Sequence, residues 1–127
     1  MKYRTFLDYI EPTGRNVIEE WLHGLPMEAR LAINTRIQYL EVAEKLGRPY
    51  TAMLHGKCEG LFELRITHSK IQYRPLACYG PEKGQVTLLV GAIEKGDRLE
   101  PISACATALQ RKANITESGR TNEHSFK

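Results

Sequence analysis

Three apolar segments that follow one another between residues 60 and 95 place the strongest constraint on the fold of this chain. They span residues 61–67, 70–79 and 85–94, and the turns between them contain Thr-His-Ser and Gly-Pro-Glu-Lys-Gly. Apolar runs of this length, separated by Gly, Pro and short polar stretches, are typical of consecutive antiparallel strands. We therefore predict three neighbouring strands in this part of the chain.

Basic residues occur within these predicted strands. Arg65 and Arg74 lie inside two of them, and Lys95 stands at the end of the last one. A guanidinium inside a strand is costly unless it has a partner. Cations that a rigid sheet holds in place are suited to binding phosphate groups. These positions favour a hypothesis of nucleic-acid binding.

The remaining elements follow from hydrophobic periodicity. Residues 2–9 alternate loosely and suit a first strand. Apolar residues then recur at helical spacing over 15–23 and 26–46, and two helices with a short connection are typical of an antiparallel hairpin. A weaker helical pattern begins near Pro101. The predicted order is β-α-α-β-β-β-α, an α+β fold with an antiparallel sheet of about four strands, the N-terminal helical hairpin packed on one face and a C-terminal helix.

Length and local composition predict one domain and a tail. A chain of 127 residues can bury a hydrophobic core without metal or disulfides. We assign the domain to residues 1–113, because residues 114–127 are polar and aperiodic and therefore predict a disordered tail. No apolar run approaches the ~20 residues of a membrane span, and Asp8 interrupts the first apolar stretch. We expect a cytoplasmic location without membrane contact.

The cysteines and histidines predict no metal site. Cys58, Cys78 and Cys105 are an odd number at wide spacing, which favours buried reduced thiols over a disulfide framework. The four histidines are scattered, so neither a metal nor another cofactor is expected. The net charge of +3 and pI of about 8.8 are mildly basic, well short of the signature of a dedicated duplex-DNA binder.

The order of these elements and three short motifs resemble the RelE/ParE toxin superfamily, and within it the phage-derived, HigB-like branch. The motifs are residues 60–65, Tyr73-Arg74 in the next strand, and residues 88–95, which a helix starting with proline follows. The resemblance covers residues 3 to about 113. It implies a toxin of a type II toxin–antitoxin system, a metal-independent mRNA endonuclease that acts on the ribosome. It also implies a cognate antitoxin protein with a helix-turn-helix fold as partner.

By the same resemblance, four residues are the candidate catalytic group. Arg74 matches the strand arginine that contacts the scissile phosphate, and Lys95 matches a basic residue that serves the same phosphate. Arg65 matches a supporting basic position, although it can equally be the structural partner of Glu63 or of a helix glutamate such as Glu20. Glu63 stands where related enzymes often have a lysine that acts as a base.

A second group of residues is predicted to bind the substrate. Arg98 lies close to Lys95 in sequence, Lys70 begins the second of the three strands, and His55 is a candidate for acid–base work near neutral pH. Tyr73 can stack on a base, although alternating aromatic residues in a strand more often pack in the core.

Two features of the sequence keep other functions open. Glu94 replaces a basic residue that is usual at the end of the last strand, and no tyrosine stands near Pro101, where many related enzymes have one. A ParE-like toxin that binds DNA gyrase without a catalytic site is the first alternative. The second is an inactive phage-derived protein that serves only as an interaction partner.

Overall fold

The computed structural model describes residues 1–118 and 120–126 of the chain, and these form an α+β fold with three α-helices and two sheets. The helices are α1 (Val17–His23), α2 (Met27–Val42) and α3 (Ala104–Ser118). The strands are β1 (Thr5–Tyr9), β2 (Thr51–Met53), β3 (Phe62–Leu64), β4 (Ile66–His68), β5 (Ile71–Tyr73), β6 (Leu76–Tyr79), β7 (Gln85–Val90), β8 (Ile93–Lys95), β9 (Arg98–Glu100) and β10 (Thr121–Glu123). A short 3₁₀ helix, η1 (Gly56–Cys58), follows β2.

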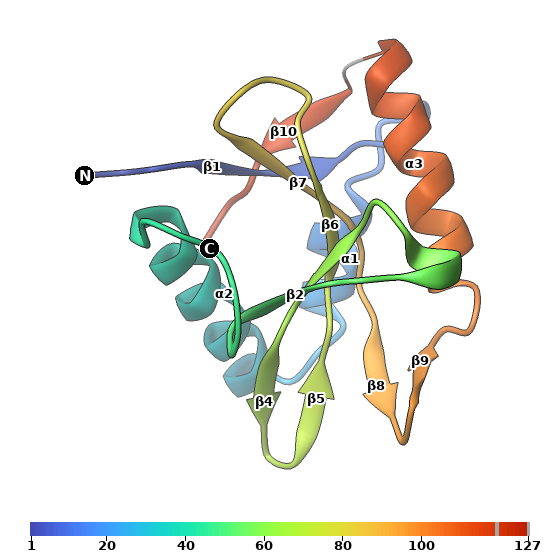
Figure 1. Cartoon of the computed structure of the whole chain (residues 1–127). Helices are drawn as coiled ribbons and strands as arrows, with labels where there is room; N and C mark the ends of the chain where they lie inside the picture. The colour runs from blue at the N-terminus through green and yellow to red at the C-terminus, as the bar shows by residue number, and fades with distance from the viewer. Residues whose placement is uncertain (119, 127) are drawn as a thin grey trace.

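Each of the three predicted central strands is divided by a bend and contributes to two sheets. One half of each predicted strand, namely β3, β6 or β7, joins a mixed six-stranded sheet. Its strand order is β10-β1-β7-β6-β3-β2, and β1 and β7 are parallel. The other halves, β4, β5 and β8, form an antiparallel sheet with β9, in the order β4-β5-β8-β9. In Figure 1 the hairpins β4–β5 and β8–β9 extend together toward the bottom of the view. The expected single antiparallel sheet of about four strands is therefore only partly correct.

The bends occur where the backbone must leave the ladder. The break between β3 and β4 falls at Arg65, whose amide donates to the carbonyl of Tyr50 at 2.8 Å. The break between β5 and β6 falls at Arg74-Pro75, and proline cannot donate to a ladder. The break between β7 and β8 includes Gly91, where an added Cβ would lie 1.9 Å from the indole ring of Trp21. Glycine is needed there because α1 packs its tryptophan directly against the backbone.

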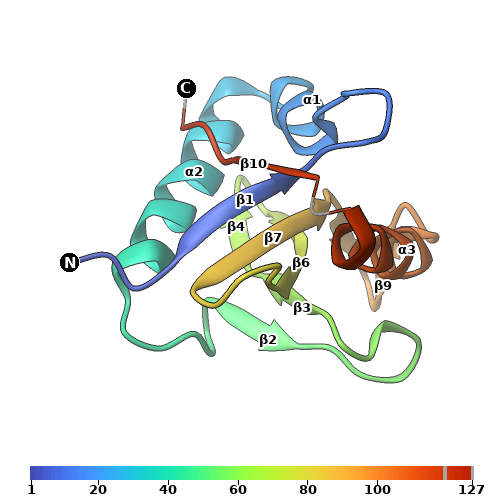
Figure 2. The ribbon, with the colours of Figure 1, turned by 90° about the horizontal axis from the view of Figure 1, so that it is seen from above.

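The helices cover both faces of the larger sheet. Figure 2 shows α1 and α2 on one side of this sheet and α3 on the other. The first core joins the helical hairpin to the sheet through residues such as Ile18, Ile33 and Leu88. The second joins α3 to it through Leu89 and Ala108. The helical hairpin was predicted on one face and is found there, and no helix of the described residues is long and apolar enough to cross a membrane.

The expected disordered tail is instead part of the fold. Residues 114–118 continue α3, so the predicted boundary at residue 113 lies inside a helix. Strand β10 pairs antiparallel with β1, and His124, only 5% exposed, follows it. Its Nδ1 lies 2.7 Å from Oδ1 of Asp8, and its Nε2 lies 2.8 Å from Oδ1 of Asn34. Backbone pairing and buried polar contacts hold this segment, which is why its lack of apolar periodicity was misleading.

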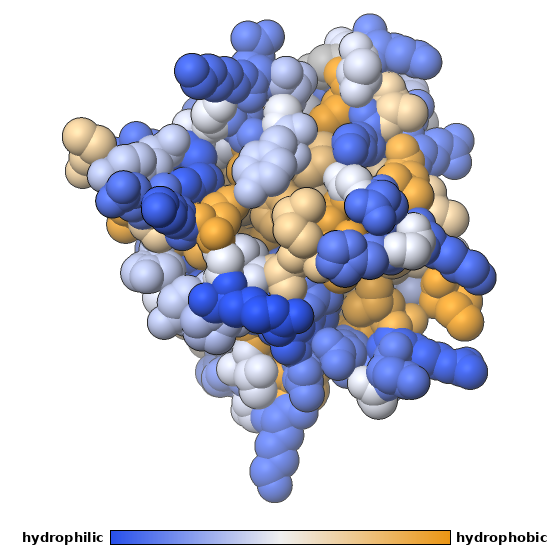
Figure 3. Space-filling view, in the orientation of Figure 1, coloured by the Kyte–Doolittle hydropathy of each residue, from blue (hydrophilic) through white to orange (hydrophobic). Residues whose placement is uncertain are grey.

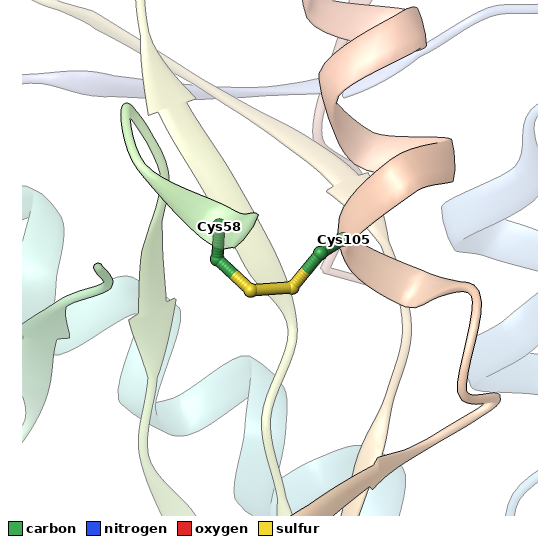
Figure 4. The surroundings of a disulfide bond; sticks show 2 residues. All are labelled: Cys58 and Cys105. Atoms are coloured by element: carbon green, nitrogen blue, oxygen red, sulfur yellow. A yellow bond between two sulfur atoms is a disulfide. The ribbon is translucent and has the colours of Figure 1, made fainter. Parts of the chain in front are cut away.

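Two of the three cysteines are joined, contrary to the prediction of reduced thiols. Cys58 in η1 and Cys105 in α3 form a disulfide with their Cα atoms 5.2 Å apart (Figure 4). Only Cys78 is a free thiol, and burial raises its pKa to about 11. The sequence spacing of 47 residues held no sign of this bond, because only packing brings α3 against the loop.

Removing the disulfide should weaken the fold. Closing a loop of this length stabilises a protein by about 2–4 kcal/mol, so the double variant Cys58→Ser/Cys105→Ser should unfold at lower urea concentration than the oxidised protein. Reductant should bring the original protein to the stability of the variant. As a control, Cys78→Ala should stay sensitive to reductant. A double variant as stable as the oxidised chain would show that the bond contributes nothing.

Candidate functional site

An open pocket of about 390 Å³ lies between α2 and the β4–β5 hairpin, at the point where the strands bend. Its lining is polar and rich in guanidinium groups, and it comprises Arg36, Pro49, Tyr50, Arg65, Thr67, Gln72 and Arg74. The pocket thus unites two of the predicted catalytic arginines with residues from three other parts of the chain.

Arg74 is the most buried of the arginines, with 2% of its surface exposed. Its Nε donates to Oε1 of Glu94 at 2.9 Å, and its two terminal nitrogens donate to the carbonyl of Tyr73 and to Oε1 of Gln72. Oε2 of Glu63 lies 3.9 Å from its Nε. A buried guanidinium needs such partners. Arg74 forms the floor of the pocket and holds neighbouring side chains, rather than offering a free face to a phosphate.

Arg65 is the more accessible cation. Its side chain is 28% exposed, and its Nη1 forms an ion pair with Glu63, whose side chain is 8% exposed. The structural pairing considered for Arg65 is confirmed for Glu63, whereas Glu20 pairs with Arg15. Among the described residues, the other guanidinium nitrogens of Arg65 have no hydrogen-bond partner. They are therefore available to a ligand in the pocket.

Arg36 and Tyr50 form one wall of the pocket, and the sequence analysis did not identify either. Nη1 of Arg36 donates to the carbonyl of Arg65 at 2.6 Å, and its Cζ lies 4.3 Å from the centre of the Tyr50 ring. The ring of Tyr39 contacts Tyr50 edge-on, with 5.2 Å between the centroids. One signal was present: Arg36 directly precedes the fully buried Ile37, which places it beside the face of α2 that meets the sheet.

Thr67, Gln72 and Glu94 form a row across the hairpins. Thr67 stands opposite Gln72 in the β4–β5 register, and Gln72 stands opposite Glu94 in the β5–β8 register. Residues opposite one another in neighbouring strands point to the same face. The row therefore lies on the face of the small sheet that carries the pocket.

The charges of the site nearly balance. Three guanidiniums, those of Arg36, Arg65 and Arg74, meet the carboxylates of Glu63 and Glu94, which leaves one net positive charge. Glu94 is thus the main counter-ion of the buried Arg74. A single excess charge is suited to one phosphodiester group rather than to a strong polyanion field.

Lys95 and Arg98 lie outside the pocket. They are partners in the β8–β9 register, and since neighbouring side chains alternate, Lys95 points to the face opposite to Glu94. The amine of Lys95 lies 3.3 Å from Glu100, and both side chains are more than half exposed. Figure 3 shows hydrophilic side chains over the ends of both hairpins. The predicted grouping of Lys95 with Arg74 is therefore not found.

The other predicted substrate-binding residues are also separate from the pocket. Tyr73 is 2% exposed and packs edge-on against Trp21, so its ring is core and cannot stack on a base. Lys70 is exposed in the turn between β4 and β5, with φ of 65°. His55 is exposed beside Glu59, in the loop that the disulfide ties to α3.

Helices on both faces of a bent, mixed sheet, with an arginine-lined pocket at the bend, define an α+β protein. The chain belongs to the family described as phage-derived Gp49-like proteins, whose sequence profile matches residues 20–113. This family is grouped with the RelE/HigB-like toxins. No curated protein matches the chain.

Proposed function

We propose that this protein is the toxin of a type II toxin–antitoxin pair and cleaves mRNA in a reaction that needs no metal, in association with the ribosome. The observation that carries the proposal is the pocket in which Arg65 offers free donors beside Arg36 and above Arg74. The family supports a toxin. A helix-turn-helix antitoxin remains the proposed protein partner.

In the proposed reaction, the ribose 2′-oxygen attacks the adjacent phosphorus. The bond from phosphorus to the 5′-oxygen breaks, which leaves a 2′,3′-cyclic phosphate and a 5′-hydroxyl. Arg65 and Arg36 neutralise the charge that develops on the phosphoryl oxygens. The leaving 5′-oxygen takes a proton from water on the open side of the pocket.

Glu94 is the proposed acceptor of the 2′-hydroxyl proton. Glu63, a candidate catalytic residue in the sequence analysis, is 6% exposed and paired with Arg65, which favours Glu94 over it in this role. The side chain of Glu94 is 28% exposed and lies in the row beside Gln72. Arg74 positions this carboxylate through the 2.9 Å contact.

Replacing Arg65 by glutamine should slow cleavage by about 10²–10³-fold, because one preorganised donor to the transition state is lost. Arg98→Gln, on the far face of the hairpin, is the matched control and should keep the rate within a few-fold. Single-turnover cleavage of RNA, with and without ribosomes, measures both variants, and mapping of the 5′ ends shows the bond that is cut. Equal rates for the two variants, or no cleavage by the unaltered protein, would refute the proposed site.

A protein-binding toxin, such as a ParE-like gyrase inhibitor, or an inactive interaction protein is the second candidate. Apolar side chains are exposed along the outer side of α2, namely Met27 (59%), Leu31 (55%), Tyr39 (47%) and Val42 (53%). Such a surface is suited to a protein partner. Inhibition of gyrase supercoiling without RNA cleavage would favour the first of these alternatives.

A further inference from the structure

We propose that the free edge of β2 is a docking site for an extended, acidic segment of a partner protein, which joins the sheet as a further strand. β2 is the last strand at one end of the six-stranded sheet, and Figure 2 shows it at the rim of the molecule. Strand addition at an exposed sheet edge is a recurring mode of peptide recognition. The proposal does not depend on the cleavage of RNA.

The register of β2 with β3 directs backbone groups of Met53 away from the sheet. The amide of the next residue, Leu54, donates to the carbonyl of Leu61 at 3.0 Å. Bonded and non-bonded residues alternate along an antiparallel pair, so the amide and carbonyl of Met53 point outward. The amide of Thr51 points the same way but donates to the carbonyl of Gly47. Among the described residues, the amide and carbonyl of Met53 have no backbone partner.

An apolar surface lies beside this edge. Met53 is 54% exposed and stands opposite the buried Phe62, whose ring centroid lies 4.9 Å from that of Tyr79, itself 60% exposed. A hollow of about 190 Å³ adjoins them and is also lined by Leu46 and Ala52. This volume is below the roughly 300 Å³ of typical small-molecule sites. It suits one apolar side chain of an added strand, because the residue opposite Met53 would point to the same face.

The charge around the edge favours an acidic partner. Residues 45–57 include Lys45, Arg48 and Lys57 but no aspartate or glutamate. All three cations are exposed, and none forms an ion pair with a described residue. Arg48 is also the one charged residue among those lining the hollow. A second copy of the chain would bring the same cations against these, whereas carboxylates at the ends of a docked segment would neutralise them.

The test is a titration of the whole protein with a blocked nonapeptide, Asp-Glu-Thr-Leu-Thr-Leu-Thr-Glu-Asp, followed by amide NMR shifts. Its centre alternates as a strand does, and its ends carry the carboxylates. We expect shifts at the amides of β2 and slower hydrogen exchange at Met53. The same peptide with lysine at its four acidic positions should bind at least about tenfold more weakly, because it meets like charges.

Two substitutions separate backbone pairing from charge. Met53→Pro removes the outward N–H, which the β2–β3 ladder does not use. Met53→Ala removes the same side chain but keeps the N–H, so it is the matched control, and we expect the proline variant to bind the acidic peptide about tenfold more weakly than it. Arg48→Glu should weaken the acidic peptide and strengthen the lysine peptide. Arg98→Glu, in β9, should change neither.

The outcomes distinguish this partner from other occupants. No binding of the acidic peptide at millimolar concentration, or equal affinities for the two peptides, would overturn the acidic partner. Equal binding by the proline and alanine variants would overturn strand addition, and if Met53→Pro does not fold, the reversed preference of Arg48→Glu decides. Shifts of β2 caused by single-stranded RNA instead of the peptide, or a dimer in ultracentrifugation that Arg48→Glu alters, would also overturn the proposal.

Discussion

Replacing Arg74 by alanine is expected to lower the free energy of unfolding by about 3–5 kcal/mol, the usual cost of breaking a buried ion pair from one side. Arg74 is 2% exposed and holds Glu94 at 2.9 Å, with Glu63 at 3.9 Å. Without it, Glu63 keeps Arg65, but Glu94 loses its only ion-pair partner among the described residues. Urea denaturation measures the difference, and Arg98→Ala, an exposed arginine, is the control.

A double-mutant cycle separates the ion pair from simple loss of packing. Glu94→Gln in the Arg74→Ala background should recover part of the lost stability, because the unpaired carboxylate is then absent. If Arg74→Ala stays within about 0.5 kcal/mol of the original protein, as surface substitutions do, the buried pairing is incorrect. The result also bears on assays of toxicity, because an inactive Arg74 variant that is partly unfolded carries no information about phosphate contact.

Deleting residues 119–127 should also destabilise the protein by about 3–5 kcal/mol. The deletion removes β10 from the edge of β1 and removes His124 from its place between Asp8 and Asn34. Asp8 is 1% exposed and, among the described side chains, would keep only the amide of Asn16, whose Nδ2 lies 2.9 Å from its Oδ2. A buried carboxylate that loses a hydrogen-bonding partner is costly. Thermal and urea denaturation of the truncated and full chains measure the loss.

Substitutions in the full chain test whether His124 carries this effect. His124→Ala should reproduce most of the loss, whereas Glu123→Ala, an exposed change in the preceding strand, should cause little. An unchanged melting temperature after truncation would mean that the segment does not dock. Strands β1 and β10 both lie outside residues 20–113, the range of the family match. In this chain the two ends therefore complete the sheet together.

Hydrophobic periodicity in the sequence was sufficient to predict the helices and strands that bury one face. The predicted helices over 15–23 and 26–46 correspond to α1 and α2, and the apolar runs between 60 and 95 are indeed strands. The pairing of Arg65 with Glu63 was also foreseeable, because two side chains two residues apart in an extended chain share a face. The spacing of apolar residues indicates which face of a helix or strand is buried.

Only the tertiary structure showed which side chains from distant parts of the chain contact one another. Sequence alternation does not show that a strand bends at Arg74 and turns its guanidinium inward, nor that Arg36 reaches the carbonyl of Arg65. The contacts of Asp8 with His124 and of Cys58 with Cys105 join residues 116 and 47 positions apart. Such contacts depend on how whole elements pack, and polar or single residues leave no periodic trace of them in the chain. The pocket likewise arises from contacts between separate elements, which is why five of its seven lining residues were not predicted.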